Sequence, residues 1–283
     1  MDYGIRLTSA AATCDDPRAA CLPAWRGLLP DGDVVALYFG TEFCEDRLPA
    51  LDEALAFCER ARARGWEATL LTPLVSPAGL RTVDHVLAGL AAHDCAPAVV
   101  FNDWGVLRLL CERHESLPRR AGRLVNRSLR DPRAYGDKPG DAGAGSTTHD
   151  ATRHARLRRF LRDLGVSAVE SDADLEGGYL GDGPGGDDAR LDRALHLPFT
   201  FAASGRGCPL KAALYPEGGG FAKAFADTCP APCRGRPMPV NRSDTALPHW
   251  RAGNTVFYEL PQDVARSWLP HTDRIVLHEA AMP

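Results

Sequence analysis

Short apolar runs rich in β-branched residues alternate along the chain with longer segments in which apolar residues recur at helical spacing. The apolar runs cover residues 34–41, 68–74, 96–102, 122–128, 167–171, 195–202, 255–260 and 274–278. Helices are predicted over 46–64, 78–92, 105–113, 150–164 and 261–269. Gly65 and Gly165 mark two helix ends. Buried-type strands alternating with helices indicate parallel βαβ units, and eight strands are enough to close a barrel.

The pattern therefore predicts one α/β domain over residues 1–283, a (β/α)8 TIM-barrel-like fold that is incomplete or distorted in places. Residues 1–33 have a weak pattern, and the Gly- and Asp-rich stretches 131–148 and 176–188 are predicted to be loops or disordered excursions. Residues 209–253 are expected to form a long cysteine-bearing loop between the sixth and seventh strands. A doubly wound sheet is the alternative, but no Gly-x-Gly-x-x-Gly follows the first strand.

Composition narrows the class of protein. The 283 residues are 45% hydrophobic and 25% charged, which is typical of a globular protein, and the net charge of −4 disfavours nucleic acid as a partner. The beginning of the chain lacks the pattern of a signal peptide, and no apolar run is long enough to span a membrane. We therefore expect a cytoplasmic protein. In that compartment nine cysteines, an odd number, indicate metal binding or burial rather than disulfides.

Three of the nine cysteines lie in one Gly- and Pro-rich stretch, residues 204–235, that is poorly suited to forming core. They are Cys208, Cys229 and Cys233. Cys44 follows the first predicted strand, and in a (β/α)8 barrel the loops after the strands share one rim, so all four thiols are expected there. Soft thiolates select zinc, copper(I) or an iron–sulfur cluster. One close pair and two isolated cysteines favour a cluster over a structural zinc site, with zinc kept as the alternative.

The other five cysteines have simpler interpretations. Cys58 and Cys111 occupy apolar helix positions, Cys95 precedes a strand, and Cys14 and Cys21 lie in the weakly patterned N-terminal segment. They are expected to be structural.

At these residues the chain resembles a known family. Residues 228–234 (TCPAPCR), 204–208 (SGRGC), 102–110 (NDWGVLRLL) and 122–133 (GRLVNRSLRDPR) resemble, in order, motifs of the collagenase-like peptidases, unassigned peptidase family U number thirty-two. Residues 39–47 (FGTEFCEDR) are similar to a segment of its UbiV-like branch, iron–sulfur proteins of oxygen-independent ubiquinone biosynthesis. The resemblance covers roughly residues 34 to 280.

The resemblance implies a barrel-like fold and a [4Fe–4S] cluster on four cysteines, which match Cys44, Cys208, Cys229 and Cys233 here. It also implies a cytoplasmic heterodimer with a paralogous, UbiU-like subunit and oxygen-independent hydroxylation of a small aromatic or quinone-like substrate. The substrate could equally belong to a secondary-metabolite pathway, because the spacer between Cys208 and Cys229 departs from the family pattern.

The sequence leaves two alternative functions open. A collagenase-like peptidase would need a nucleophile and a base, but Ser204 has no evident partner and the histidines are scattered. A non-catalytic subunit stabilised by zinc is the second. The catalytic candidates are weak: Asn102 and Asp103 at the end of the third predicted strand, Arg206 beside Cys208, and Glu279, which with His278 ends the last strand.

Overall fold

The computed structural model confirms the predicted barrel. The structure describes residues 1–10, 25, 27–126, 151–175, 190–226, 228–234 and 236–278. Eight strands close in the order β1-β12-β7-β6-β5-β4-β3-β2, and every neighbouring pair is parallel. The predicted stretches 131–148 and 176–188 lie outside the described residues.

The strands of the barrel are β1 (Asp2–Arg6), β2 (Asp33–Gly40), β3 (Glu67–Leu71), β4 (Ala98–Phe101), β5 (Arg119–Ala121), β6 (Val166–Ser171), β7 (Asp192–Leu197) and β12 (Arg274–His278).

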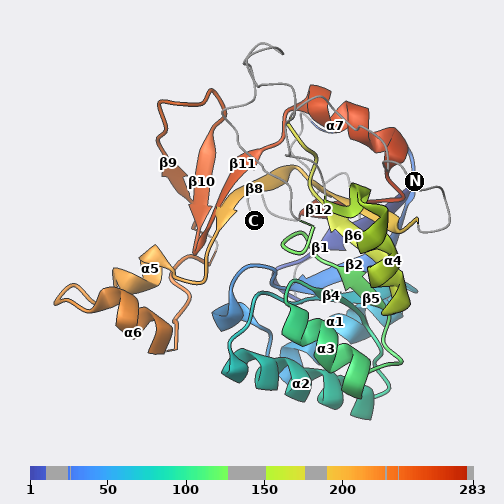
Figure 1. The fold of residues 1–283 in the computed structure, drawn as a ribbon, viewed down its shortest axis with the longest axis horizontal. Coiled ribbons are helices and arrows are strands. Elements are labelled where there is room, and N and C mark those ends of the chain that lie inside the picture. Colours follow the sequence, from blue (N-terminus) through green and yellow to red (C-terminus); the bar gives the residue numbers. More distant parts are fainter. Residues whose placement is uncertain are drawn as a thin grey trace.

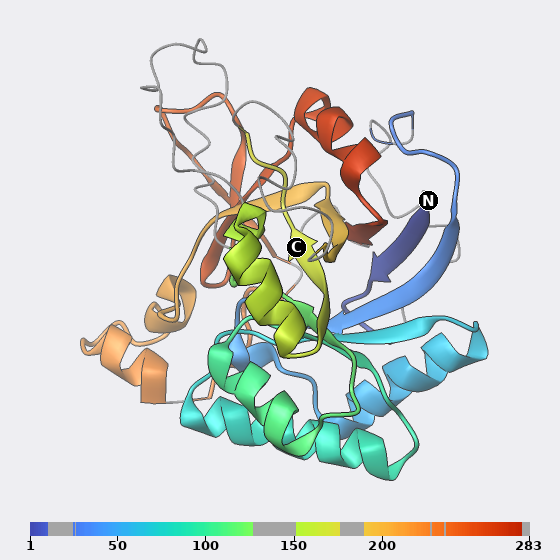
Figure 2. The same ribbon diagram turned by 45° about the vertical axis from the view of Figure 1, so that its right-hand side comes forward.

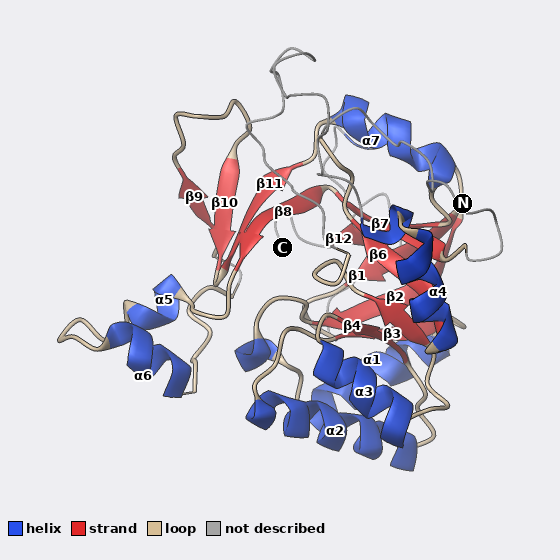
Figure 3. Cartoon of the chain, viewed as in Figure 1, coloured by secondary structure: helices blue, strands red, loops and turns tan. Residues whose placement is uncertain are grey.

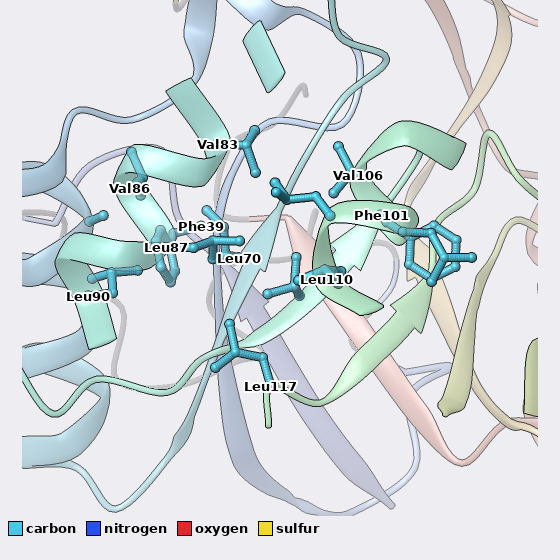
Figure 4. Packing of buried hydrophobic residues seen from close by; sticks show 14 of the residues in the cluster. Phe39, Leu70, Val83, Val86, Leu87, Leu90, Phe101, Val106, Leu110 and Leu117 are labelled. Atoms are coloured by element: carbon cyan, nitrogen blue, oxygen red, sulfur yellow. The ribbon is translucent and has the colours of Figure 1, made fainter. Parts of the chain in front are cut away.

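Helices α1 (Leu51–Ala63), α2 (Pro77–Ala92) and α3 (Trp104–Arg113) cover one side of the barrel, with α4 (Ala155–Asp163) and α7 (Gln262–Trp268) elsewhere on its outside (Figure 1). The side chains between the first three helices and the strands form the largest apolar cluster, in which Phe39, Leu70, Leu87 and Leu110 converge (Figure 4). This layer fixes the strands and, with them, the ends from which the functional loops leave.

A second sheet lies beside the barrel. It is antiparallel, in the order β8-β11-β10-β9, from β8 (Phe199–Ser204), β9 (Met238–Val240), β10 (His249–Ala252) and β11 (Thr255–Glu259). Short helices α5 (Pro209–Ala212) and α6 (Gly220–Ala226) project below it (Figure 3). The turned view shows that the sheet stands at the end toward which β1 and β2 point (Figure 2). Phe43 of the loop after β2 packs against Phe201 and Phe257 of the sheet.

The strand assignment made from sequence was wrong in four places. The barrel begins with β1, which lies in the segment of weak pattern, because Asp2–Arg6 is short and interrupted by Gly4. A Cβ on Gly4 would lie 2.4 Å from the Tyr38 ring, so the close approach of the two strands requires glycine. The predicted seventh strand, 255–260, is β11 of the antiparallel sheet; it is apolar because it is buried there, not because it belongs to the barrel.

The other two differences concern 195–202 and 122–128. The first run divides at Pro198 into β7 of the barrel and β8 of the second sheet. In the second run, residues 122–126 form a turn after β5, and 127–128 lie outside the described residues. The predicted loop 209–253 carries α5, α6, β9 and β10. It is therefore a structured insertion, and its antiparallel strands were missed because they are only three and four residues long.

Candidate functional site

Cys44 and Cys208 line one cavity of about 310 Å³, although they are far apart in sequence. Cys44 lies shortly after β2, and Cys208 is the residue that precedes α5, where its sulfur accepts the backbone N–H of Lys211 at 3.4 Å. The structure thus brings together two predicted ligands that are remote from each other in the chain. Glu45, Asp46 and Arg206 line the same cavity.

An ion pair joins the two segments. Lys211, whose side chain is 4% exposed, donates from Nζ to Asp46 Oδ2 at 2.9 Å. Asp46 lies two residues after Cys44, and Lys211 lies three residues after Cys208. The pair therefore holds the two cysteine-bearing turns against each other.

Cys233 and Cys229 approach the same place from the insertion. Cys233 lines a smaller cavity of about 20 Å³ with Cys44 and Arg6, and a Cβ on Gly253 would lie 3.3 Å from its sulfur. Cys229 is partly buried, and its sulfur accepts the backbone N–H of Ala231 at 3.4 Å. It is close enough to Asp46, Lys211 and Cys208 for their charges to affect its pKa.

Burial raises the pKa of the Cys44 thiol to about 12, with smaller effects from Asp46 and Cys208. Burial also raises the pKa of Cys229. Both sulfurs are therefore thiols near neutral pH when nothing binds them. A soft metal centre would displace these protons, because thiolate is the ligand form.

Four cysteine sulfurs are suitable ligands for a soft metal. A zinc ion and an iron–sulfur cluster require different spacings of these sulfurs. Within the described ranges, no three His, Cys, Asp or Glu side chains converge closely enough to hold a single metal ion. A zinc ion needs four sulfurs each about 2.3 Å from one point. In an iron–sulfur cluster each cysteine binds a different iron, so the thiols stand around a larger group. In this structure Cys44, Cys208 and Cys233 line two cavities that share Cys44, and Cys229 lines neither of them.

The other cysteines lie elsewhere. Cys58 and Cys95 are buried in the main apolar cluster, and Cys111 is partly buried on α3. Cys14 and Cys21 lie outside the described residues.

A buried network of charges at the carboxyl ends of the strands was not predicted from sequence. Arg123, fully buried, makes two hydrogen bonds to Glu42 and one of 2.8 Å to Asp172. Arg6 lies 3.3 Å from the same Glu42 carboxylate. Burial alone would raise the pKa of Glu42, but the positive charges around it, Arg123 foremost, outweigh burial and lower that pKa to about 2.

A second part of this network fills the barrel interior. Glu170 accepts from Arg120 Nε at 2.6 Å and lies 2.8 Å from His196 Nε2, and the other nitrogen of His196 lies 3.2 Å from His278 Nε2. Burial would raise the pKa of Glu170, but Arg120 and His196 together lower it, so the group is a carboxylate. Burying so many ionisable groups often costs more stability than apolar residues would, which makes the mouth of the barrel a candidate functional site.

The sequence held only a partial signal for this network. Glu42 and Asp172 directly follow predicted strands, whereas Arg123 lies inside the predicted strand 122–128 and follows β5 only in the structure. Their pairing depends on barrel closure, which places β1, β2, β5 and β6 around one axis.

The structure places the four weak catalytic candidates in different surroundings. Asn102 is buried and holds two loops, donating to Thr72 O at 2.8 Å and accepting from Leu124 N at 2.8 Å. Asp103 caps α3 and accepts from Gly105 N at 2.7 Å. Arg206 lines the larger cavity, and Glu279 lies outside the described residues. The hydrogen bonds of Asn102 and Asp103 stabilise loops and a helix end, whereas Arg206 lies in the cavity that Cys44 and Cys208 line.

The chain matches no protein-family model and no curated protein. Among solved structures it is similar to a U32 peptidase, Mk0906, at 12% sequence identity and a TM-score of 0.45, over 100% of this chain and 94% of that one. A likeness at this level does not bear on activity. Within the described residues no helix is both long and apolar enough to cross a membrane.

Proposed function

We propose that the chain is an iron–sulfur protein that holds a [4Fe–4S] cluster on Cys44, Cys208, Cys229 and Cys233. The observation that carries the proposal is the shared cavity of Cys44 and Cys208, because neither position is close to the other in sequence. Cys233 adjoins Cys44 in the neighbouring cavity. Cys229 is within electrostatic range of Cys208.

When bound, such a cluster supplies one-electron transfer. The chain's own residues supply the rest of the site. The Lys211–Asp46 pair holds the two cysteine turns together. Phe43 packs in one apolar cluster with Phe199, Phe201 and Phe257 of the second sheet, next to the thiol site. Arg206 reaches the cavity and can donate hydrogen bonds to a bound anion or to sulfur.

We further propose that this centre serves an oxygen-independent hydroxylation of a small aromatic or quinone-like molecule, together with a paralogous UbiU-like partner in a cytoplasmic heterodimer. The four-cysteine pattern and the motif resemblance support this step. Co-purification with the paralogue, followed by product analysis under anaerobic conditions, tests it separately from the cluster.

The cluster is tested by anaerobic purification and reconstitution, with iron, sulfide and zinc measured together with the visible spectrum. We expect about four irons and four sulfides per chain. Alanine at Cys44, Cys208, Cys229 or Cys233 should each lower that content, and Cys111→Ala is the matched control on α3. Zinc without sulfide would overturn the cluster and favour the zinc-stabilised subunit.

The same preparation tests the peptidase alternative. The Ser204 hydroxyl lies 2.8 Å from the Thr255 hydroxyl, not from a base. A peptidase would degrade gelatin or casein whether or not the cysteines had been replaced. Gelatin or casein degradation that persists in Cys44→Ala would favour that alternative.

A further inference from the structure

The hydrogen-bond chain inside the barrel ends on His278. This residue is 2% exposed, and its Nδ1 is buried and has no hydrogen-bond partner among the residues that the structure describes. Its other nitrogen, Nε2, lies 3.2 Å from His196 Nδ1. A buried polar atom left unsatisfied lowers stability, so such an atom calls for an explanation.

The proton positions along the chain follow from Glu170. Its Oε1 accepts from Arg120 Nε, and its Oε2 lies 2.8 Å from His196 Nε2. A carboxylate only accepts, so His196 Nε2 carries a proton and donates it. In neutral His196 the Nδ1 atom is then an acceptor, and His278 Nε2 must be the donor to it. The unpartnered Nδ1 of His278 is consequently a bare lone pair.

The surroundings of His278 are suited to a neutral base. Arg6 is its register partner on the neighbouring strand β1, Arg123 faces it from the turn after β5, and His196 faces it from β7. Phe199 of β8 packs beside its ring. Burial first, and then Arg6, Arg123 and His196, lower the pKa of His278 well below its usual value.

Arg6 also connects this position to the thiol site. Its side chain lines the cavity of about 20 Å³ that Cys44 and Cys233 line, a volume sufficient for one water molecule. Arg6, the register partner of His278, therefore adjoins a cavity that a hydroxyl donor can occupy.

We propose that Glu170, His196 and His278 form a proton relay that serves the barrel mouth and accepts a proton at His278 Nδ1 from an O–H donor, either water or a hydroxyl-bearing ligand. The O–H bond breaks as the Nδ1–H bond forms, and the Nε2 proton of His278 passes to His196 Nδ1. The proton comes to rest on His196, which Glu170 holds as its counter-ion. The donor is left as an anion near Arg6 and Arg123. The relay involves none of the cysteines, so it stands or falls independently of the cluster.

Glu170→Gln provides a specific test. Oxygen must stay toward Arg120, which donates, so the new amide NH₂ faces His196 and donates to its Nε2. His196 must then carry its proton on Nδ1 and donate to His278, which in turn becomes protonated at Nδ1. Both rings change tautomer although only residue 170 was altered.

The measurement is long-range ¹H–¹⁵N correlation NMR on chain labelled with ¹⁵N-histidine. In the unaltered protein we expect His278 to carry its proton on Nε2 at neutral pH, and in Glu170→Gln on Nδ1. Glu67→Gln, an exposed carboxylate-to-amide change on β3, is the control and should leave His278 unchanged. A His278 signal indifferent to residue 170 overturns the relay. If Glu170→Gln fails to fold, the unaltered protein still decides, since an Nδ1–H tautomer there overturns the open acceptor.

Discussion

Lys211 Nζ lies 2.9 Å from Asp46 Oδ2, and this one ion pair spans 165 residues of sequence. Both residues are next to predicted metal ligands, and Lys211 also donates its backbone N–H to Cys208. The pair therefore links the integrity of the thiol site to a contact that contains no thiol.

Lys211→Met should weaken the thiol site more than the fold. Asp46 would lose its partner while 24% of its side chain stays exposed, so we expect a loss of about 1–2 kcal/mol in the free energy of unfolding. Iron content after reconstitution should fall at least threefold, because the two cysteine turns separate. Urea unfolding and iron analysis measure the two effects. Arg108→Met, at an exposed pair on α3, is the control, and equal iron content in the two variants would contradict the role of the pair.

Gly253→Ala should disturb Cys233 directly. Gly253 has φ of +63°, where an L side chain is strained, and a Cβ there would lie 3.3 Å from the sulfur. We expect a loss of about 1 kcal/mol in unfolding free energy and a lower iron content. Gly65→Ala shares a positive φ but meets open space, so it should cost similar stability without affecting iron. Similar iron loss in both variants would mean that strain alone was responsible.

Arg123→Met should be among the most destabilising single changes. It leaves Glu42 and Asp172 buried without their shared partner, which costs about 3–5 kcal/mol. Arg123→Lys keeps the positive charge but loses the bidentate hydrogen bonds to Glu42. It should therefore recover only part of the lost free energy of unfolding. Chemical denaturation of both variants checks the order. If the lysine variant were as stable as the original protein, the bidentate pairing of the guanidinium with Glu42 would not contribute to stability.

Glu170 should make the free energy of unfolding depend on pH. Its folded-state pKa lies below the ordinary value of 4.5, so the unfolded chain takes up a proton first as pH falls. The stabilisation is therefore fully present above pH 4.5 and is lost progressively below it. Unfolding free energies at pH 6.5, 4.5 and 3.5 should fall more steeply for the original protein than for Glu170→Gln. Parallel curves would show that this carboxylate contributes no such dependence.

The fold class was predictable because it is encoded locally. Runs such as 34–41 and 96–102 carry the apolar, β-branched pattern of buried parallel strands, and the helices between them have clear amphipathic spacing. The first strand was missed because Asp2–Arg6 is short and contains Gly4, whose role is set by the Tyr38 ring of the neighbouring strand β2. The strand β11 was misplaced because its apolar pattern fits either sheet.

The sequence by itself determined the alternating α/β pattern and the identity of four candidate thiols, since both depend on residue type and spacing. Only the tertiary structure decided that Cys44 and Cys208 share a cavity, that Lys211 reaches Asp46, and that Glu170, His196 and His278 line up. The physical reason is that closure of the barrel brings strand ends together from the whole chain. The energies of buried ion pairs and hydrogen bonds depend on those distances, which no local pattern contains.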